Sequence, residues 1–152
     1  MRPDRSHGIE RMVRVLNGDI RRELRVADVC LSRASHLPRD YYPVVHRQIA
    51  ITAATALANV TALAAEVLAL GGIPAVPGPA QRRRLSAKAI ESWQAQARQM
   101  LARYRRRLRM AEGFGLFRLR EVLEHIVGTK ERFLAQSGLI QAGDPAGRYL
   151  CS

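Results

Sequence analysis

The stretch LAAEVLALGGIPAVPGP, residues 63–79, divides the chain into two helical halves. Its first part is rich in alanine and leucine, which favour helix, and it closes with Gly71-Gly72, a typical C-terminal helix cap. The segment IPAVPGP at 73–79 then holds three prolines, and proline has no amide hydrogen to donate within a helix. The sequence therefore predicts that a helix ends near Gly72 and that an extended, polyproline-like connection follows it.

Two long helices are expected before this connection. The first runs from about Ser6, a residue type that caps helix N-termini, to about His36, and the segment LPRD at 37–40 ends it. The second begins near Tyr42 and ends at the glycine pair. Apolar residues recur every three or four positions in both, as an amphipathic bundle helix requires. The expected inward positions are Ile9, Val13, Leu16, Ile20, Ala27, Cys30 and Ala34, then Ile49, Ala53, Ala56, Val60, Leu63, Val67 and Leu70.

Two further helices are expected after the connection. The third runs from about Ala80 to Glu112 and the fourth from about Leu116 to Ser137, with a Gly-Phe-Gly turn at 113–115 between them. Both carry the same three-and-four spacing of apolar residues. Their expected inward positions are Ile90, Ala97, Leu101, Tyr104, Leu108 and Ala111, then Leu119, Leu123, Ile126, Phe133 and Leu134.

The order of short and long connections indicates an all-α fold in one domain, which suits a chain of 152 residues. Short turns join the first helix to the second and the third to the fourth, and only the central connection is long. This is the arrangement of ferritin-like up-down four-helix bundles, whereas cytokine-like bundles need two long crossovers. We therefore expect a ferritin-like bundle over residues 1–138 and an irregular C-terminal tail over 139–152, with Gly138 capping the last helix.

The second helix is apolar on nearly all sides. Between Ile49 and Val76 the only charged residue is Glu66. A span of this length is long enough to cross a membrane. Its many alanines and threonines are weak membrane formers, however, and the amphipathic helices on either side of it would be left without a core. We therefore favour an outer face that packs against another protein subunit, with a membrane span as the less favoured alternative.

One polar residue interrupts the apolar pattern near the midpoint of each helix: Glu23, Asn59, Gln94 and Lys130. In an up-down bundle the four midpoints come together, so periodicity predicts one buried polar cluster whose members bond to one another. We expect Glu23 and Lys130 to form a buried ion pair, with Asn59 and Gln94 satisfying the remaining donors and acceptors. The alternative is that Glu23 or Lys130 extends to solvent and nothing meets at the centre.

Three segments resemble helices of bacterioferritins and related ferritin-like proteins: LNGDIRRELRVADVCL at 16–31, LAAEVLALGGIP at 63–74 and LREVLEHIVGTKERFL at 119–134. The similarity covers roughly Ile9 to Gly138. Such proteins carry a glutamate on two helices and a Glu-x-x-His pair on each of the other two, and these side chains bind two iron ions. The resemblance places the six ligand positions at Glu23, Ala56, Asn59, Gln94, Val127 and Lys130.

Of these six positions, only Glu23 keeps the residue type of an iron ligand. A di-iron centre needs about four carboxylates to balance and bridge its cations, and Lys130 would supply a fixed positive charge where a cation would lie. The methionine that binds haem between bacterioferritin subunits falls on Leu57. The resemblance thus implies the fold without its metal, and we expect neither a bound metal nor a cofactor.

The chain carries 25 Lys and Arg residues against 13 Asp and Glu, a formal net charge of +12. This excess implies an anionic partner (nucleic acid, an acidic protein surface or an anionic membrane face) unless the charges are simply spread over solvated faces. The basic residues cluster at the start and near the end of the third helix. The candidates for partner binding are Arg82, Arg83, Arg84, Arg103, Arg106 and Arg107, with Arg105 and Arg109 beside them.

The sequence contains no legible catalytic motif. No histidine pairs with another histidine or a carboxylate at a convincing ligand spacing, and Glu121 and His125 lie off the core stripe of the fourth helix, where a solvated face is expected. Cys30 and Cys151 form no Cys-x-x-Cys motif. The N-terminus lacks the apolar region of a signal peptide, so a reduced, cytoplasmic location is expected.

These features favour a protein that is not an enzyme. We expect a non-catalytic structural or accessory subunit of a larger protein assembly, whether a homo-oligomer or a mixed complex. Two alternatives stay open: a ferritin-family shell subunit in iron storage beside a ligand-complete partner, and a basic protein that associates with DNA. An iron assay, salt-dependent DNA binding and the native mass separate the three.

Overall fold

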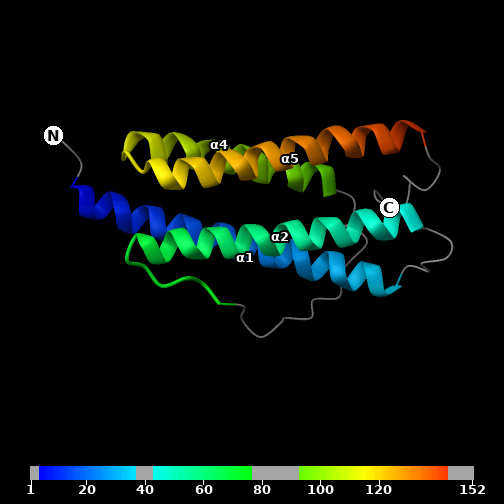
Figure 1. Ribbon diagram of the computed structural model, residues 1–152, viewed down its shortest axis with the longest axis horizontal. Helices are drawn as coiled ribbons and strands as arrows, with labels where there is room; N and C mark the ends of the chain where they lie inside the picture. The colour runs from blue at the N-terminus through cyan, green and yellow to red at the C-terminus, as the bar shows by residue number, and fades with distance from the viewer. Residues whose placement is uncertain (1–3, 37–42, 77–92, 144–152) are drawn as a thin grey trace.

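The computed structural model describes residues 4–36, 43–76 and 93–143. These residues form α1 (Arg5–His36), α2 (Pro43–Ala69), α4 (Trp93–Gly113) and α5 (Phe117–Gly143). Figure 1 shows two antiparallel pairs, α1 with α2 and α4 with α5, whose long axes run together to make one bundle. The prediction of an all-α, four-helix bundle is confirmed.

The long connection follows from the direction of the helices. In Figure 1, α2 and α4 run the same way, so the chain must return along the length of the bundle between them. The described part of this connection, residues 73–76, is fixed to α1 by one side chain. The side-chain nitrogen Nδ2 of Asn17 donates to the carbonyl of Ile73 (2.9 Å), and its side-chain oxygen Oδ1 accepts from the backbone N–H of Ala75 (2.7 Å). Asn17 thereby holds the start of the crossover against the bundle.

The C-terminal ends of α2 and α4 close in the same way. At the end of α2, Gly71 has φ 79°, and the N–H of Gly72 donates to the carbonyl of Val67 at 2.9 Å. At the end of α4, Gly115 has φ 67°, and the N–H of Leu116 donates to the carbonyl of Ala111 at 2.9 Å. These are Schellman caps, in which glycine supplies the left-handed residue. The predicted glycine cap of α2 and the predicted Gly-Phe-Gly turn after α4 are confirmed.

Two of the expected helix ends need correction. The cap of α1 is Asp4, whose carboxylate accepts from the N–H of Ser6 at 3.2 Å, so Ser6 lies inside the helix. At the other end of the chain, α5 continues to Gly143, and Gly138 does not cap it. The segment LIQA at 139–142 consists of helix-compatible residues, and one interior glycine costs a helix only about 1 kcal/mol. The irregular tail therefore does not begin at residue 139. Residues 144–152 and the expected helix start at Ala80 lie outside the described residues.

The core lies between the two helical pairs and follows the predicted stripes closely. Met12 takes the buried place expected for Val13, which packs against the core from its edge. Fully or nearly fully buried apolar side chains come from all four helices: Met12, Leu16, Ile20, Ile49, Leu63, Val67, Tyr104, Ala111, Leu119, Leu123 and Ile126. The spacing of apolar residues therefore predicts most of the core correctly.

Helix α2 has two different faces. By length and composition, residues 46–69 could cross a membrane, but core helices of soluble proteins share that property. Its inner face carries two buried polar residues that bond to other helices: Asn59 to Glu23 on α1, and Glu66 to Arg118 on α5. Its outer face exposes Ile51, Leu57 and Leu68. On its inner side α2 is thus an ordinary bundle helix, and the apolar outer side has no partner among the described residues.

Candidate functional site

The carboxylate of Glu23 is buried in the middle of the bundle, and three groups from the other helices reach its oxygen Oε1. Nζ of Lys130 on α5 lies 2.9 Å away. Oη of Tyr104 on α4 donates a hydrogen bond of 2.7 Å. Nδ2 of Asn59 on α2 donates a longer one of 3.3 Å. Each of the four helices thus contributes one residue to a central polar cluster, defined here as Glu23, Asn59, Tyr104 and Lys130.

The ion pair between Glu23 and Lys130 is predicted by the sequence and is confirmed, as is the contact with Asn59. The side chain of Gln94 lies outside the described residues, so its place in the cluster stays a prediction. Tyr104 is expected to be buried from its spacing, but that spacing does not predict a bond between its hydroxyl and Glu23. Periodicity counts a tyrosine ring as apolar, although a buried phenol normally finds a hydrogen-bond partner.

The surroundings of Glu23 explain how charge is accommodated in the core. The side chain of Lys130 is only 12% exposed, and its Nζ lies 5.4 Å from the centre of the Tyr104 ring, within cation–π distance. Burial raises the pKa of the Tyr104 phenol well above 10.0, and the neighbouring charge of Glu23 and their hydrogen bond raise it further. The phenol therefore remains a donor. The other carboxylate oxygen, Oε2, is buried and accepts no hydrogen bond from the part of the chain that is described.

The donor chemistry of this cluster does not fit a di-iron centre. It offers one carboxylate, and the ammonium of Lys130 already lies beside it, where a bound cation would be repelled. Ala56 is buried and Val127 half-buried, and neither side chain has a ligand atom. Within residues 4–36, 43–76 and 93–143, no three His, Cys, Asp or Glu side chains gather as a metal site would require. One carboxylate cannot balance two iron cations.

The architecture is similar to that of an iron protein of known structure. The bacterioferritin of Desulfovibrio desulfuricans, solved with its diiron site in different catalytic states, matches with a TM-score of 0.78. The match covers 97% of this chain and 88% of that chain. The chain has the ferritin-like fold. Sequence identity over the match is 18%, so the likeness establishes the fold alone.

Sequence comparisons add no closer relationship, since no protein-family model and no curated protein sequence matches the chain. The fold nevertheless gives the central polar cluster its significance. In ferritin-like di-iron proteins the ligands project inward from all four helices, and this cluster also draws one side chain from each helix. The resemblance places Glu23, Asn59 and Lys130 at ligand positions, and in the structure Asn59 and Lys130 both contact Oε1 of Glu23. Their assignment to ligand positions stays a prediction from the resemblance.

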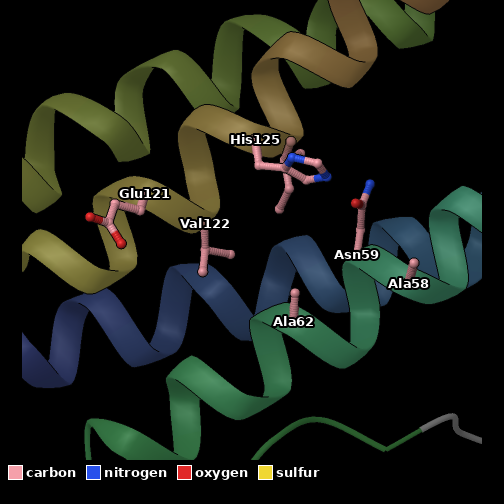
Figure 2. Close-up of a pocket in the computed structure, with 7 residues that line it drawn as sticks. Ala58, Asn59, Ala62, Glu121, Val122 and His125 are labelled. Carbon is pink, nitrogen blue, oxygen red and sulfur yellow. The ribbon is translucent and has the colours of Figure 1, made fainter.

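A groove of about 380 Å³ between α2 and α5 is the other concave feature of interest. Figure 2 shows His125 of α5 facing Asn59 of α2, with Ala58 and Ala62 also on α2, whereas the carboxylate of Glu121 points away from His125. Both Glu121 and His125 are exposed, as the sequence predicts. An exposed imidazole and an exposed carboxylate that do not bond to each other do not make a catalytic pair. The groove therefore adds no chemistry to the central polar cluster.

The predicted partner-binding arginines are only partly available for a partner. Arg82, Arg83 and Arg84 lie outside the described residues. Arg107 is held inside the molecule: its Nε donates to Oδ2 of Asp19 on α1 at 2.9 Å, and its side chain is 14% exposed. Arg103 is half-buried and Arg106 exposed, and neither bonds to a described carboxylate. Arg105 pairs with Glu131 on the surface. Partner binding by Arg103 and Arg106 stays a prediction.

Two buried carboxylates are not among the site residues predicted from the sequence. Asp19 is 2% exposed and pairs with both Arg22 and Arg107, while Glu66 is 4% exposed and pairs with Arg118. The sequence holds a signal for Asp19, because it lies one helical turn before Glu23 and therefore on the same inward stripe. Glu66 is visible as the lone charge of an apolar helix. Both residues join different helices through ion pairs.

Proposed function

We propose that this protein is a non-catalytic structural or accessory subunit of a larger cytoplasmic protein assembly, and that it works without a di-iron centre. The observation that carries the proposal is the ion pair between Glu23 and Lys130 at the middle of a ferritin-like bundle. It supplies a fixed cation in the region where ferritin-like di-iron proteins bind iron. With that chemistry replaced by a salt bridge, the surface of the bundle becomes the place to look for function.

The outer face of α2 supports a role in assembly. Ile51, Leu57 and Leu68 are 51%, 45% and 62% exposed, and small residues fill most of the positions between them. From residue 49 to the end of the helix, the one charged side chain is Glu66, which is buried and points inward. Exposed apolar side chains on a helix face with no charged residue favour a protein–protein interface. We propose that another protein subunit covers this face.

The proposal is tested by the native mass of the full chain, tagged and purified from its own source. The expected result is a complex with a second polypeptide in a fixed ratio, from which Leu57→Glu releases the chain. Leu31→Glu is the matched control, because Leu31 is a comparably exposed leucine (56%) on α1. A homomeric shell that takes up iron, or a lone chain indifferent to Leu57→Glu, would refute the proposal.

A further inference from the structure

A buried carboxylate of α1 binds two arginines, and two more arginines lie beside one of these on α4. Asp19 is 2% exposed and uses both oxygens: Oδ1 accepts from Nη1 of Arg22, and Oδ2 accepts from Nε of Arg107, each at 2.9 Å. On α4, Arg103 lies four residues before Arg107 and three before Arg106, so the three side chains are neighbours on the helix surface. The charges of Arg22, Asp19, Arg106 and Arg107 all act on the guanidinium of Arg103. We define Arg22, Arg103, Arg106 and Arg107 as the arginine cluster.

Asp19 fixes the geometry of the arginine cluster but does not neutralise it. Four positive charges against the one negative charge of Asp19 leave a net charge of about +3 on these five side chains. Burial lowers the pKa of the Arg103 guanidinium, and the charge of Arg22 lowers it further, partly offset by Asp19. Holding these like charges close together therefore costs free energy, and a bound anion would lower that cost.

Several N–H donors of Arg22 and Arg107 are not bonded to Asp19 and are available to bind a ligand. A guanidinium has five N–H groups, and the bonds to Asp19 use one on Arg22 and one on Arg107. The side chain of Arg22 is 35% exposed and that of Arg107 14% exposed, so some of the remaining donors reach the surface. Gly18 contributes as well: a Cβ there would lie 3.3 Å from Nη1 of Arg22, so its missing side chain lets the guanidinium lie close to the helix.

We propose that the arginine cluster binds a phosphate group. Three uncompensated charges and many convergent N–H donors suit a phosphate, which carries up to two charges on several oxygens, better than a single carboxylate. Asp19 holds Arg22 and Arg107 in place before the ligand arrives, so little side-chain freedom is lost on binding. The proposal goes beyond the assembly role and does not depend on it, because α2 contributes no residue to the cluster.

The test uses the full chain in low-salt buffer free of phosphate and sulfate, with inorganic phosphate and pyrophosphate titrated by calorimetry. The expected result is saturable binding at one site, weakened about tenfold by Arg103→Gln and by Arg106→Gln, since each removes a charge-assisted bond. Both variants should fold, because neither side chain bonds to a described carboxylate. Arg47→Gln is the control, because Arg47 is an exposed arginine of α2.

A duplex DNA oligonucleotide and polyglutamate distinguish the sources of the anion. If the chain binds DNA, and Arg103→Gln and Arg106→Gln weaken that binding more than Arg47→Gln does, the arginine cluster is a phosphate site that accepts a phosphodiester. This holds whether or not free phosphate also binds. Binding of free phosphate alone supports a site for a small phosphorylated ligand. Polyglutamate binding with the same dependence and no phosphate binding would overturn the proposal. Equal losses of affinity in Arg103→Gln, Arg106→Gln and Arg47→Gln would overturn it too, because binding would then depend only on the net charge of the protein.

Discussion

Replacement of Lys130 by methionine isolates the ion pair at the centre of the bundle. Methionine keeps most of the volume and removes the charge, so the carboxylate of Glu23 stays buried with hydrogen bonds from Tyr104 and Asn59 but without a cation. Removing one partner of a buried pair costs about 3–5 kcal/mol. We expect the lower end, about 3 kcal/mol, because those two hydrogen bonds remain and Lys130 is not completely buried.

This loss is measured by urea unfolding and by a thermal melt. For a chain of this length, about 3 kcal/mol corresponds to a fall in Tm of about 6–12 °C.

Two further variants make the experiment decisive. In Glu23→Gln/Lys130→Met the central polar cluster holds no charge, and Tyr104 and Asn59 can still donate to the amide oxygen, so most of the lost stability should return. Arg105→Met is the matched control. It breaks the exposed pair of Arg105 and Glu131, whose side chains are 53% and 49% exposed, and should cost no more than about 1 kcal/mol. If Lys130→Met costs no more than Arg105→Met, the buried ion pair does not stabilise the core.

Three other predictions concern different parts of the bundle. Tyr104→Phe removes a hydrogen bond to a charged group and should cost about 1.5–3 kcal/mol in urea unfolding. Because the folded pKa of Tyr104 is raised above 10.0, the stability tied to its protonated phenol is present below that pH and lost above it, so the variant should be less sensitive to alkali. Burial raises the pKa of Cys30 to about 12, so with Cys151→Ser the folded protein should resist alkylation near pH 8 and the unfolded chain should not. Fast alkylation of folded protein would show that Cys30 is accessible. Asn17→Ala removes two bonds to the crossover and should cost about 1–2 kcal/mol, with faster proteolysis after the end of α2; an unchanged cleavage rate would count against the clamp.

The fold can be predicted from the sequence because the helices and connections carry strong local signals. Glycine pairs, prolines and regular apolar spacing define the helices, and the order of the connections defines the topology. The same spacing is enough to predict that Glu23, Asn59 and Lys130 meet. Predictions fail where the local signal is ambiguous. Gly138 can end a helix or lie within one, and the chain continues α5 through it.

The details of the polar contacts do not follow from periodicity alone. The hydroxyl of Tyr104 reaches Glu23 because of the distance between α1 and α4, which no spacing within one helix encodes. In the same way, the sequence places Arg107 in a basic surface cluster, and its long side chain instead turns inward to Asp19. The spacing of apolar residues assigns side chains to faces of helices, whereas the pairing of side chains across helices depends on how the helices pack.

A salt bridge and its hydrogen bonds lie at the centre of this ferritin-like bundle, and we propose that they take the place of a metal site. Anaerobic titration of ferrous iron into the purified full-length protein, followed by metal analysis and a thermal melt, tests this most directly. We predict no stoichiometric iron binding and no change in Tm. Two iron ions per chain with a raised Tm, both abolished by Glu23→Gln, would contradict it.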